Sequence, residues 1–148
     1  MRFAFALLTC FFLSVLLHAQ NLSCSGCPAR FNPSHHRNSV CLSEKDLITH
    51  IATRKPIEPP GLREPHMNSH GTVVACLCFS RQGAVTDIRI LSGPAMMQQS
   101  TLESLKDWTF YPVKQGGKLN GGCGTLRIHI DMNDSHVSTT IEEPERHE

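Results

Sequence analysis

The most regular hydrophobic pattern in the chain is a pair of short apolar stretches separated by a turn. Residues 72–80 and 84–91 are rich in apolar and β-branched side chains, and Arg81-Gln82-Gly83 lies between them. Such stretches are typical of strands, and Gly83 permits the positive φ that a tight turn requires. The pattern therefore predicts a β-hairpin.

Helical spacing predicts one helix after this hairpin, and capping residues predict another before it. Side chains of one helical face recur at steps of three and four residues after Pro94, at Met97, Thr101, Leu105 and Trp108. Earlier in the chain, Ser43 can cap a short helix that has Asp46 at its third position and ends before Pro56. Residues 20–41 are rich in Ser, Asn, Pro, Cys and His, and they predict an irregular lead.

A third strand is predicted near the carboxyl end. Residues 123–131 alternate apolar and polar side chains, as a strand with one buried face does. The glycine clusters Gln115-Gly116-Gly117 and Asn120-Gly121-Gly122 predict turns before this strand. From residue 133 to residue 148 no pattern repeats and acidic residues dominate, so we expect a disordered tail.

The order strand, strand, helix, strand predicts an α+β fold. A purely antiparallel sheet built from these elements has three strands in the order second, first, third (2-1-3), with the helix on one face of this ββαβ core. Residues 123–131 then lie at a sheet edge, where backbone N–H and C=O groups are unpaired on one side. Alternation places Cys76, Cys78 and Cys123 on the face without the helix.

The amino terminus has the pattern of a signal peptide. Residues 3–17 carry no charge, Arg2 precedes them, and the small Ala19 suits the position before a cleavage site. We therefore expect residues 1–19 to be removed, the mature chain to have no membrane span, and the protein to be exported to the periplasm or secreted. Retention as a membrane anchor and lipidation at Cys24 are the alternatives.

Six cysteines remain after removal of the segment that contains Cys10, namely Cys24, Cys27, Cys41, Cys76, Cys78 and Cys123. An even number in an exported chain predicts disulfides. Because paired side chains on neighbouring strands must lie on one face, we expect Cys123 to pair with Cys76 or Cys78, and the other to pair with a cysteine of the lead. The alternative is a zinc site made by Cys24, Cys27, Cys41 and either His35 or His36.

Composition and charge exclude several classes of function. The 148 residues suffice for one domain, and 14 basic against 13 acidic residues without a basic cluster provide no footprint for nucleic acid. The sequence has no Ser-His-Asp arrangement, no paired carboxylates in an apolar setting and no glycine-rich phosphate loop. We expect a protein that is not an enzyme, carries no cofactor or metal, and recognises its partner through shape and backbone pairing.

The stretch from residue 56 to residue 132 resembles the TonB carboxy-terminal domain, the periplasmic end of energy transducers that serve outer-membrane transporters. The resemblance rests on Gly71-Thr72-Val73, Gly83-Ala84-Val85, Leu91-Ser92-Gly93 and Trp108-Thr109-Phe110-Tyr111-Pro112. The motif and core positions that it implies are Gly71, Val73, Gly83, Val85, Gly93, Trp108, Phe110 and Pro112. The expected divisions are a signal peptide (1–19), a Cys-rich lead with a short helix (20–55), the TonB-like domain (56–132) and the disordered acidic tail (133–148).

This resemblance implies a protein partner. Members of the family bind a short extended peptide of a transporter by adding it as a strand to the sheet, which implies a non-enzymatic module linked to transport across the cell envelope. The expected peptide-binding edge comprises Thr125, Leu126, Arg127, Ile128, His129 and Ile130. Pairing of two such edges would produce a homodimer. The alternative is a secreted structural or metal-binding protein that is stapled by disulfides and uses the same fold.

Overall fold

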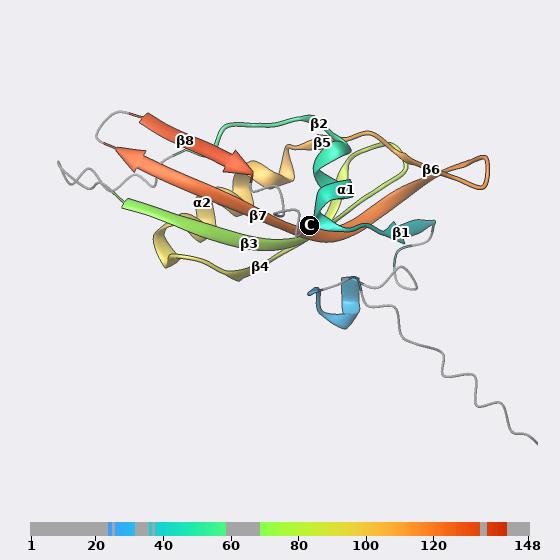
Figure 1. Cartoon of the computed structure of the whole chain (residues 1–148), viewed down its shortest axis with the longest axis horizontal. Helices are drawn as coiled ribbons and strands as arrows, with labels where there is room; N and C mark the ends of the chain where they lie inside the picture. The colour runs from blue at the N-terminus through green and yellow to red at the C-terminus, as the bar shows by residue number, and fades with distance from the viewer. Residues whose placement is uncertain are drawn as a thin grey trace, which may run out of the picture.

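The centre of the molecule is a long antiparallel pair of strands. The computed structural model describes residues 24, 26–31, 36, 38–58, 69–133 and 136–141; the predicted signal peptide lies outside them. Within the described residues, β3 (Ser69–Phe79) and β7 (Lys118–Asn133) pair continuously, from Ser69 opposite Met132 to Phe79 opposite Gly122. The other elements are arranged around this pair (Figure 1).

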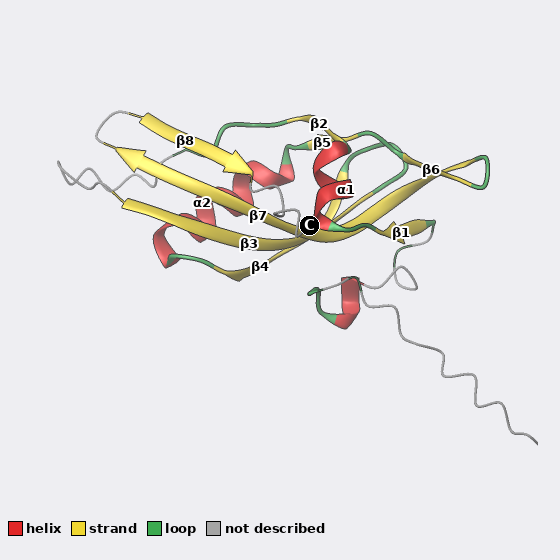
Figure 2. Cartoon of the chain, viewed as in Figure 1, coloured by secondary structure: helices red, strands yellow, loops and turns green. Residues whose placement is uncertain are grey.

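Short strands and α-helices complete the described fold, as Figure 2 shows. In chain order they are the 3-10 turn η1 (Ala29–Phe31), β1 (Ser39–Cys41), α1 (Glu44–Thr49), β2 (Ile51–Thr53), β4 (Val85–Ser92), α2 (Ala95–Lys106), β5 (Thr109–Phe110), β6 (Val113–Gln115) and β8 (His136–Ile141). The main sheet has six strands, with β1, β7, β3 and β4 side by side and with β6 and β8 also paired to β7. Strands β2 and β5 form a separate pair. Neither α-helix of the described part is long and apolar enough to cross a bilayer.

The prediction of an α+β fold is confirmed, together with its central elements. Strands β3 and β4 form the predicted hairpin, and Gly83 has a φ of +88° in its turn. Helix α2 buries the predicted face through Met97, Thr101 and Leu105. Since β3 pairs antiparallel with both β4 and β7, the three predicted strands lie in the predicted order.

The prediction that the sheet has only three strands, with β7 at its edge, is wrong. Strand β1 runs parallel to β7, from Ser39 opposite Gly121 to Cys41 opposite Cys123, and β8 runs antiparallel to β7 over residues 128–133. The sheet is therefore mixed. The prediction of a disordered tail over residues 133–148 is also wrong where β8 forms. Both strands are short and pair with β7 through their backbones, and such pairing leaves little hydrophobic periodicity in the sequence.

The predicted turn at residues 120–122 is wrong as well, because these residues lie inside β7. A Cβ atom at Gly121 would overlap the carbonyl oxygen of Phe79 on the neighbouring strand. The glycine therefore permits a close approach of two backbones and does not reverse the chain. The reversal lies earlier, at Gly116 and Gly117, whose φ angles are +57° and +75°.

The main core lies between the sheet and α2, and aromatic residues close one end of it. The rings of Phe79 and Phe110 stack with their centroids 4.6 Å apart. Trp108 is 2% exposed, and its indole N–H donates to the carbonyl oxygen of Lys55 and to Ser104 Oγ, both at 3.0 Å. Because the N–H is satisfied inside the core, Trp108 has a structural role, as expected.

The segment after β2 is fastened to the end of α2 by a charged pair. Lys55 Nζ donates to Asp107 Oδ2 at 2.7 Å. This hydrogen bond and the charge of Asp107 raise the pKa of the Lys55 ammonium. Since both side chains are exposed, salt screens the pair and it adds little to stability.

Helix α1 begins as predicted. The backbone N–H of Asp46 donates to Ser43 Oγ at 3.1 Å, which makes Ser43 the N-cap. Leu47 is fully buried in the main core and anchors the helix. The helix ends at Thr49, well before Pro56, and Ile51 begins β2 and lies opposite Phe110 of β5.

We predict that Gly121→Ala destabilises the fold, because its methyl group would overlap the carbonyl oxygen of Phe79. The free energy of unfolding should fall by about 3 kcal/mol, as measured by urea denaturation followed through Trp108 fluorescence. Gly116→Ala is the control, since a Cβ atom there meets nothing within 4 Å and only its positive φ costs about 1 kcal/mol. Equal losses in the two variants would contradict the close approach.

Candidate functional site

The candidate site is the outer edge of β7, on the side away from β3. The N–H of Gly121 donates to the carbonyl oxygen of Asn38 at 2.8 Å, and the carbonyl oxygen of Cys123 accepts from the N–H of Leu42 at 2.8 Å. The backbone groups of alternate residues in a strand point the same way. The odd-numbered residues of β7, up to Asn133, therefore direct their N–H and C=O groups to the outer edge.

A carboxylate covers the middle of this edge. Glu44, the first residue of α1, accepts the backbone N–H of Arg127 through Oε1 at 2.7 Å and contacts Arg127 Nη1 through Oε2. The Glu44 side chain is only 10% exposed. Because Ser43 caps α1 and Leu47 anchors it, the carboxylate is held where a neighbouring strand would offer a carbonyl oxygen. Glu44 thus replaces one contact of a β-ladder.

Strand β8 covers the far end of the same edge (Figure 1). His129 lies opposite Thr140, and Asp131 lies opposite Ser138. Since these residues of β7 are odd-numbered, they form the hydrogen-bonded pairs of the ladder. The prediction of an open edge over residues 125–130 is therefore wrong, because residues 128–130 are paired with the chain's own strand.

The described side chains of β8 contribute little packing. The side chains of Ser138, Thr139 and Thr140 are exposed, and Ile141 is half-buried where it packs against the main core. The ladder hydrogen bonds of such a strand contribute about 1 kcal/mol each, and little apolar burial adds to them. In its described side chains, β8 is therefore less firmly attached than β3 and β7, which carry buried residues of the main core.

The opposite margin of the sheet, at β4, is less suited to an added strand. The register of β4 against β3 shifts near both ends, and such irregularities increase the local twist. Asp87 and Arg89 place charges along this margin, and Ala84 is already bridged to Thr109. Charges and irregular pairing are features that discourage strand addition.

The sheet face opposite α2 is predicted to be uncovered, but the lead partly covers it. Phe31 is fully buried there, in a second core that it forms with the cysteines. The disulfides are Cys24–Cys41, Cys27–Cys76 and Cys78–Cys123. The predicted pairing is confirmed, because Cys123 bonds to one strand cysteine and the other bonds to the lead.

Arg127 and His129 project from this face, as their alternation predicts. Arg127 is exposed and contacts Glu44. His129 is half-buried, and its Nδ1 lies 3.3 Å from Thr72 Oγ1 on β3. Both side chains therefore already have partners within the chain.

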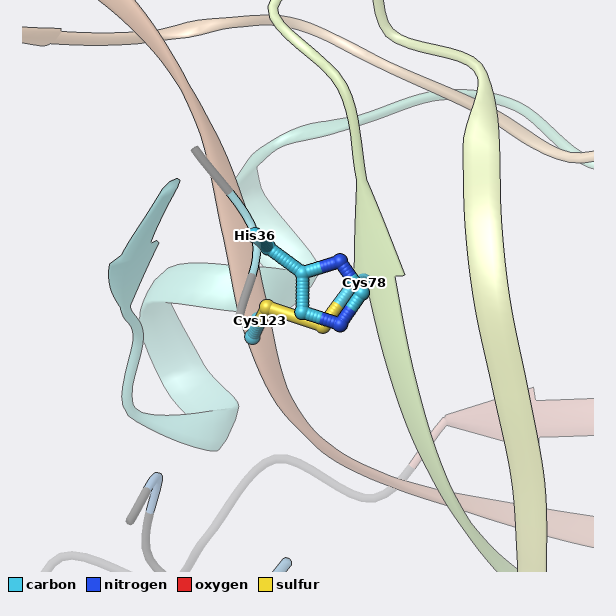
Figure 3. Close-up of side chains that lie close together, drawn as sticks. All are labelled: His36, Cys78 and Cys123. Carbon is cyan, nitrogen blue, oxygen red and sulfur yellow. A yellow bond between two sulfur atoms is a disulfide. The ribbon is translucent and has the colours of Figure 1, made fainter. Parts of the chain in front are cut away.

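The disulfides exclude the predicted zinc alternative in this oxidised form, because Cys24, Cys27 and Cys41 offer no thiolate. His35 lies outside the described residues. His36 lies against the Cys78–Cys123 disulfide, with its ligand atom and both sulfurs within 4.8 Å of one another (Figure 3). These sulfurs are bonded to each other as well, so the cluster is a packed disulfide and not a metal centre.

The motif residues of the sequence lie at close contacts between elements. Gly83 sits against the carbonyl oxygen of Phe110, and Gly93, with a φ of +138°, sits against Val73. A side chain at either glycine would meet these neighbours and would also be strained by the positive φ. The motif residues thus position the hairpin, α2 and β5, and they support the candidate edge without being part of it.

Two components of the site were missed in the sequence. Glu44 gives no signal, because an acidic residue at the start of a helix is ordinary. Strand β8 has one weak signal, the β-branched run Thr139-Thr140-Ile141, which favours a strand. The acidic residues around this run dominate the composition of the segment, and composition therefore predicts disorder there.

Comparison with known families agrees with the resemblance seen in the sequence. Residues 63–131 match the family model described as Gram-negative bacterial TonB protein C-terminal. The match includes β3, β4, α2 and most of β7, whereas the lead and β8 lie outside it. No curated protein matches the chain.

We predict that Glu44→Ala exposes the Arg127 amide to exchange. The variant leaves the N–H of Arg127 without its acceptor, so the free energy of unfolding should fall by about 1–3 kcal/mol and the Arg127 amide should exchange faster with deuterium. Glu44→Gln, which keeps an oxygen acceptor, should lie between the variant and the wild type. Lys45→Ala on the exposed side of α1 is the control, and an equal effect there would argue against the contact.

We predict that the three disulfides coexist in the oxidised protein. Peptide mapping under non-reducing conditions should recover Cys24 linked to Cys41, Cys27 to Cys76 and Cys78 to Cys123. Because every one of these sulfurs is bonded, dialysis of the oxidised protein against zinc should leave less than one bound ion in ten chains, as an order-of-magnitude expectation. Recovery of Cys123 as a free thiol would contradict the arrangement of the second core.

Proposed function

The segment of residues 63–131 belongs to the TonB C-terminal domain family, and from this premise we propose that the protein is a non-enzymatic interaction module of the cell envelope. Its ligand is an extended peptide that adds as a strand to the main sheet. The partner class is a segment of a periplasmic or outer-membrane protein, such as an outer-membrane transporter. The three disulfides are consistent with an oxidising compartment outside the cytoplasm.

The observation that carries this proposal is the strand pairing along the outer edge of β7. This edge pairs with one strand of its own chain in parallel and with another antiparallel. The parallel pairing lies at residues 121–123 and the antiparallel pairing at residues 128–133, so two separate stretches of the edge bind a strand through their backbone. Backbone pairing is the basis of peptide recognition by strand addition. The nearly balanced charge of the chain fits the same mode, since no strong field selects the partner.

The geometry favours the β7 side of the sheet over the β4 side. Residues 125–130, expected from the resemblance to bind the peptide, lie on this side, with Arg127 and His129 on the face opposite α2. Their side chains can contact residues of an added strand at alternate positions. The β4 margin offers an irregular register and two charged residues instead.

We predict that amino-terminal peptides of outer-membrane transporters shift the amide signals of β7 and β8. In a titration of ¹⁵N-labelled protein, the shifts should be concentrated in residues 127–133 and 136–141, because a strand added on this side changes their hydrogen bonds. Residues 86–92 of β4 should remain unshifted and serve as the internal reference.

The matched control is the same peptide with alternate backbone amides N-methylated. It keeps every side chain but cannot form the ladder, so it should not bind. If no transporter peptide shifts any amide, the proposal fails and the alternative, a secreted structural protein stapled by disulfides, is favoured. Shifts confined to β4 would place the partner at the other margin.

A further inference from the structure

We infer that β8 is a built-in competitor of the partner peptide. In the free protein it occupies the stretch of β7 that a partner strand would pair with, and binding exchanges one strand for the other. This inference rests on the proposed strand addition at β7. It adds a regulatory property to that site, because the affinity for any partner then depends on how firmly β8 is attached.

The overlap between the two strands follows from the register. Strand β8 pairs with β7 from Ile128 opposite Ile141 to Asn133 opposite His136. The backbone groups of His129 and Asp131 point to β8, and each can pair with only one strand at a time. A peptide that uses these residues of β7 must therefore displace β8.

Of the three elements that cover the outer edge, β8 has the weakest anchor among the side chains that the structure describes. Strand β1 contains Cys41, which is bonded to Cys24. Glu44 belongs to α1, and that helix is fixed by the fully buried Leu47. In β8, the described side chains are exposed except for the half-buried Ile141. Exchange is thus expected at residues 128–133, whereas β1 and α1 stay in place.

The exchange of one strand for the other also has a small net energetic cost in its contacts. A partner strand would restore the ladder hydrogen bonds that β8 gives up, so the backbone terms nearly cancel. The apolar face of β7, which includes Ile128 and Ile130, stays buried against the main core because these side chains point to the α2 side. Among the described side chains, release of β8 therefore removes only Ile141 from its packing against the main core.

The first test uses the wild-type protein and amide hydrogen exchange. The N–H groups of Ile128 and Ile130 point to β3, whereas those of His129 and Asp131 point to β8. If β8 detaches without global unfolding, the amides of His129 and Asp131 should exchange about a hundredfold faster than those of Ile128 and Ile130. Equal protection of the two sets would overturn the inference, because β8 would then open only with the whole fold.

The second test compares two proline variants of the full chain. Thr139 and Thr140 are both exposed, but only Thr140 directs its N–H to β7, since it lies opposite His129. Thr140→Pro removes a ladder hydrogen bond and weakens β8, whereas Thr139→Pro removes an N–H that points outward. The two changes are otherwise matched.

The probe is a fluorescein-labelled peptide with the sequence of residues 134–143, followed by fluorescence anisotropy. Thr140→Pro should bind it about tenfold tighter than the wild type does, and Thr139→Pro should bind it within about twofold of the wild type. A chain that ends at residue 135 should match Thr140→Pro. Equal affinity of all variants, or weaker binding by Thr139→Pro alone, would overturn the inference; the latter would place the probe on the outer edge of β8.

The two proposals fail separately. Tight binding of the probe to Thr140→Pro, together with no binding of transporter peptides to any variant, would support an exchangeable β8 and refute the proposed partner class. Binding of transporter peptides with the same affinity by the wild type and by Thr140→Pro would support the proposed function and refute the competition.

Discussion

The ladder between β3 and β7 is the constraint on which the rest of the structure depends. It runs without a register shift from Ser69 to Phe79, so the side-chain parity of β7 is fixed over its length. Apolar residues such as Ile128 face α2, whereas Cys123 lies opposite Cys78 on the other face. A slip by one residue would exchange the two faces, bury polar side chains and separate the cysteines. One register thus determines both cores.

The parts of the fold that depend on this parity could be predicted from the sequence. The alternation in residues 123–131 and the positions of Cys76 and Cys78 suffice to place the cysteines on one face and to limit the partner of Cys123 to Cys76 or Cys78, of which Cys78 is the partner. The capping of α1 by Ser43 depends only on nearby residues, so it could also be predicted from the sequence. Patterns of this kind are strong because each one reflects burial or a backbone group that must be satisfied.

The parts that could not be predicted depend on contacts between distant segments. Gly121 looks like a turn residue, but its lack of a side chain serves the close approach of Phe79. Glu44 completes the edge at Arg127, which is distant in the sequence. No periodicity records such a contact, because a single carboxylate and a single N–H have no pattern. The candidate edge could therefore be located, but its occupants could not.

The elements that cover the outer edge of β7 protect it from pairing with other chains. An exposed strand edge invites pairing with other chains, and β7 is long enough to be a substantial template. The chain covers it with a parallel strand, a helix-borne carboxylate and an antiparallel strand, in that order along β7. Only the last of these coverings lacks a disulfide or a fully buried anchor in the described residues. Protection against non-specific pairing and access for a partner can thus be assigned to different parts of one edge.

A tethered competitor also changes what the edge selects. Since β8 belongs to the same chain, its effective concentration at β7 is on the order of millimolar or higher. A partner that offers only backbone hydrogen bonds forms the same bonds that β8 gives up and gains no free energy from them. The partner must therefore gain from its side chains, opposite Asp131 and His129 on one face and beside Ile128 on the other. Strand β8 presents small, uncharged side chains at Ser138 and Thr140, so a basic or larger residue at those positions has contacts to gain. An open edge would bind extended chains with little discrimination. An edge that is already paired binds only those chains whose contacts with β7 are more favourable than the contacts of β8.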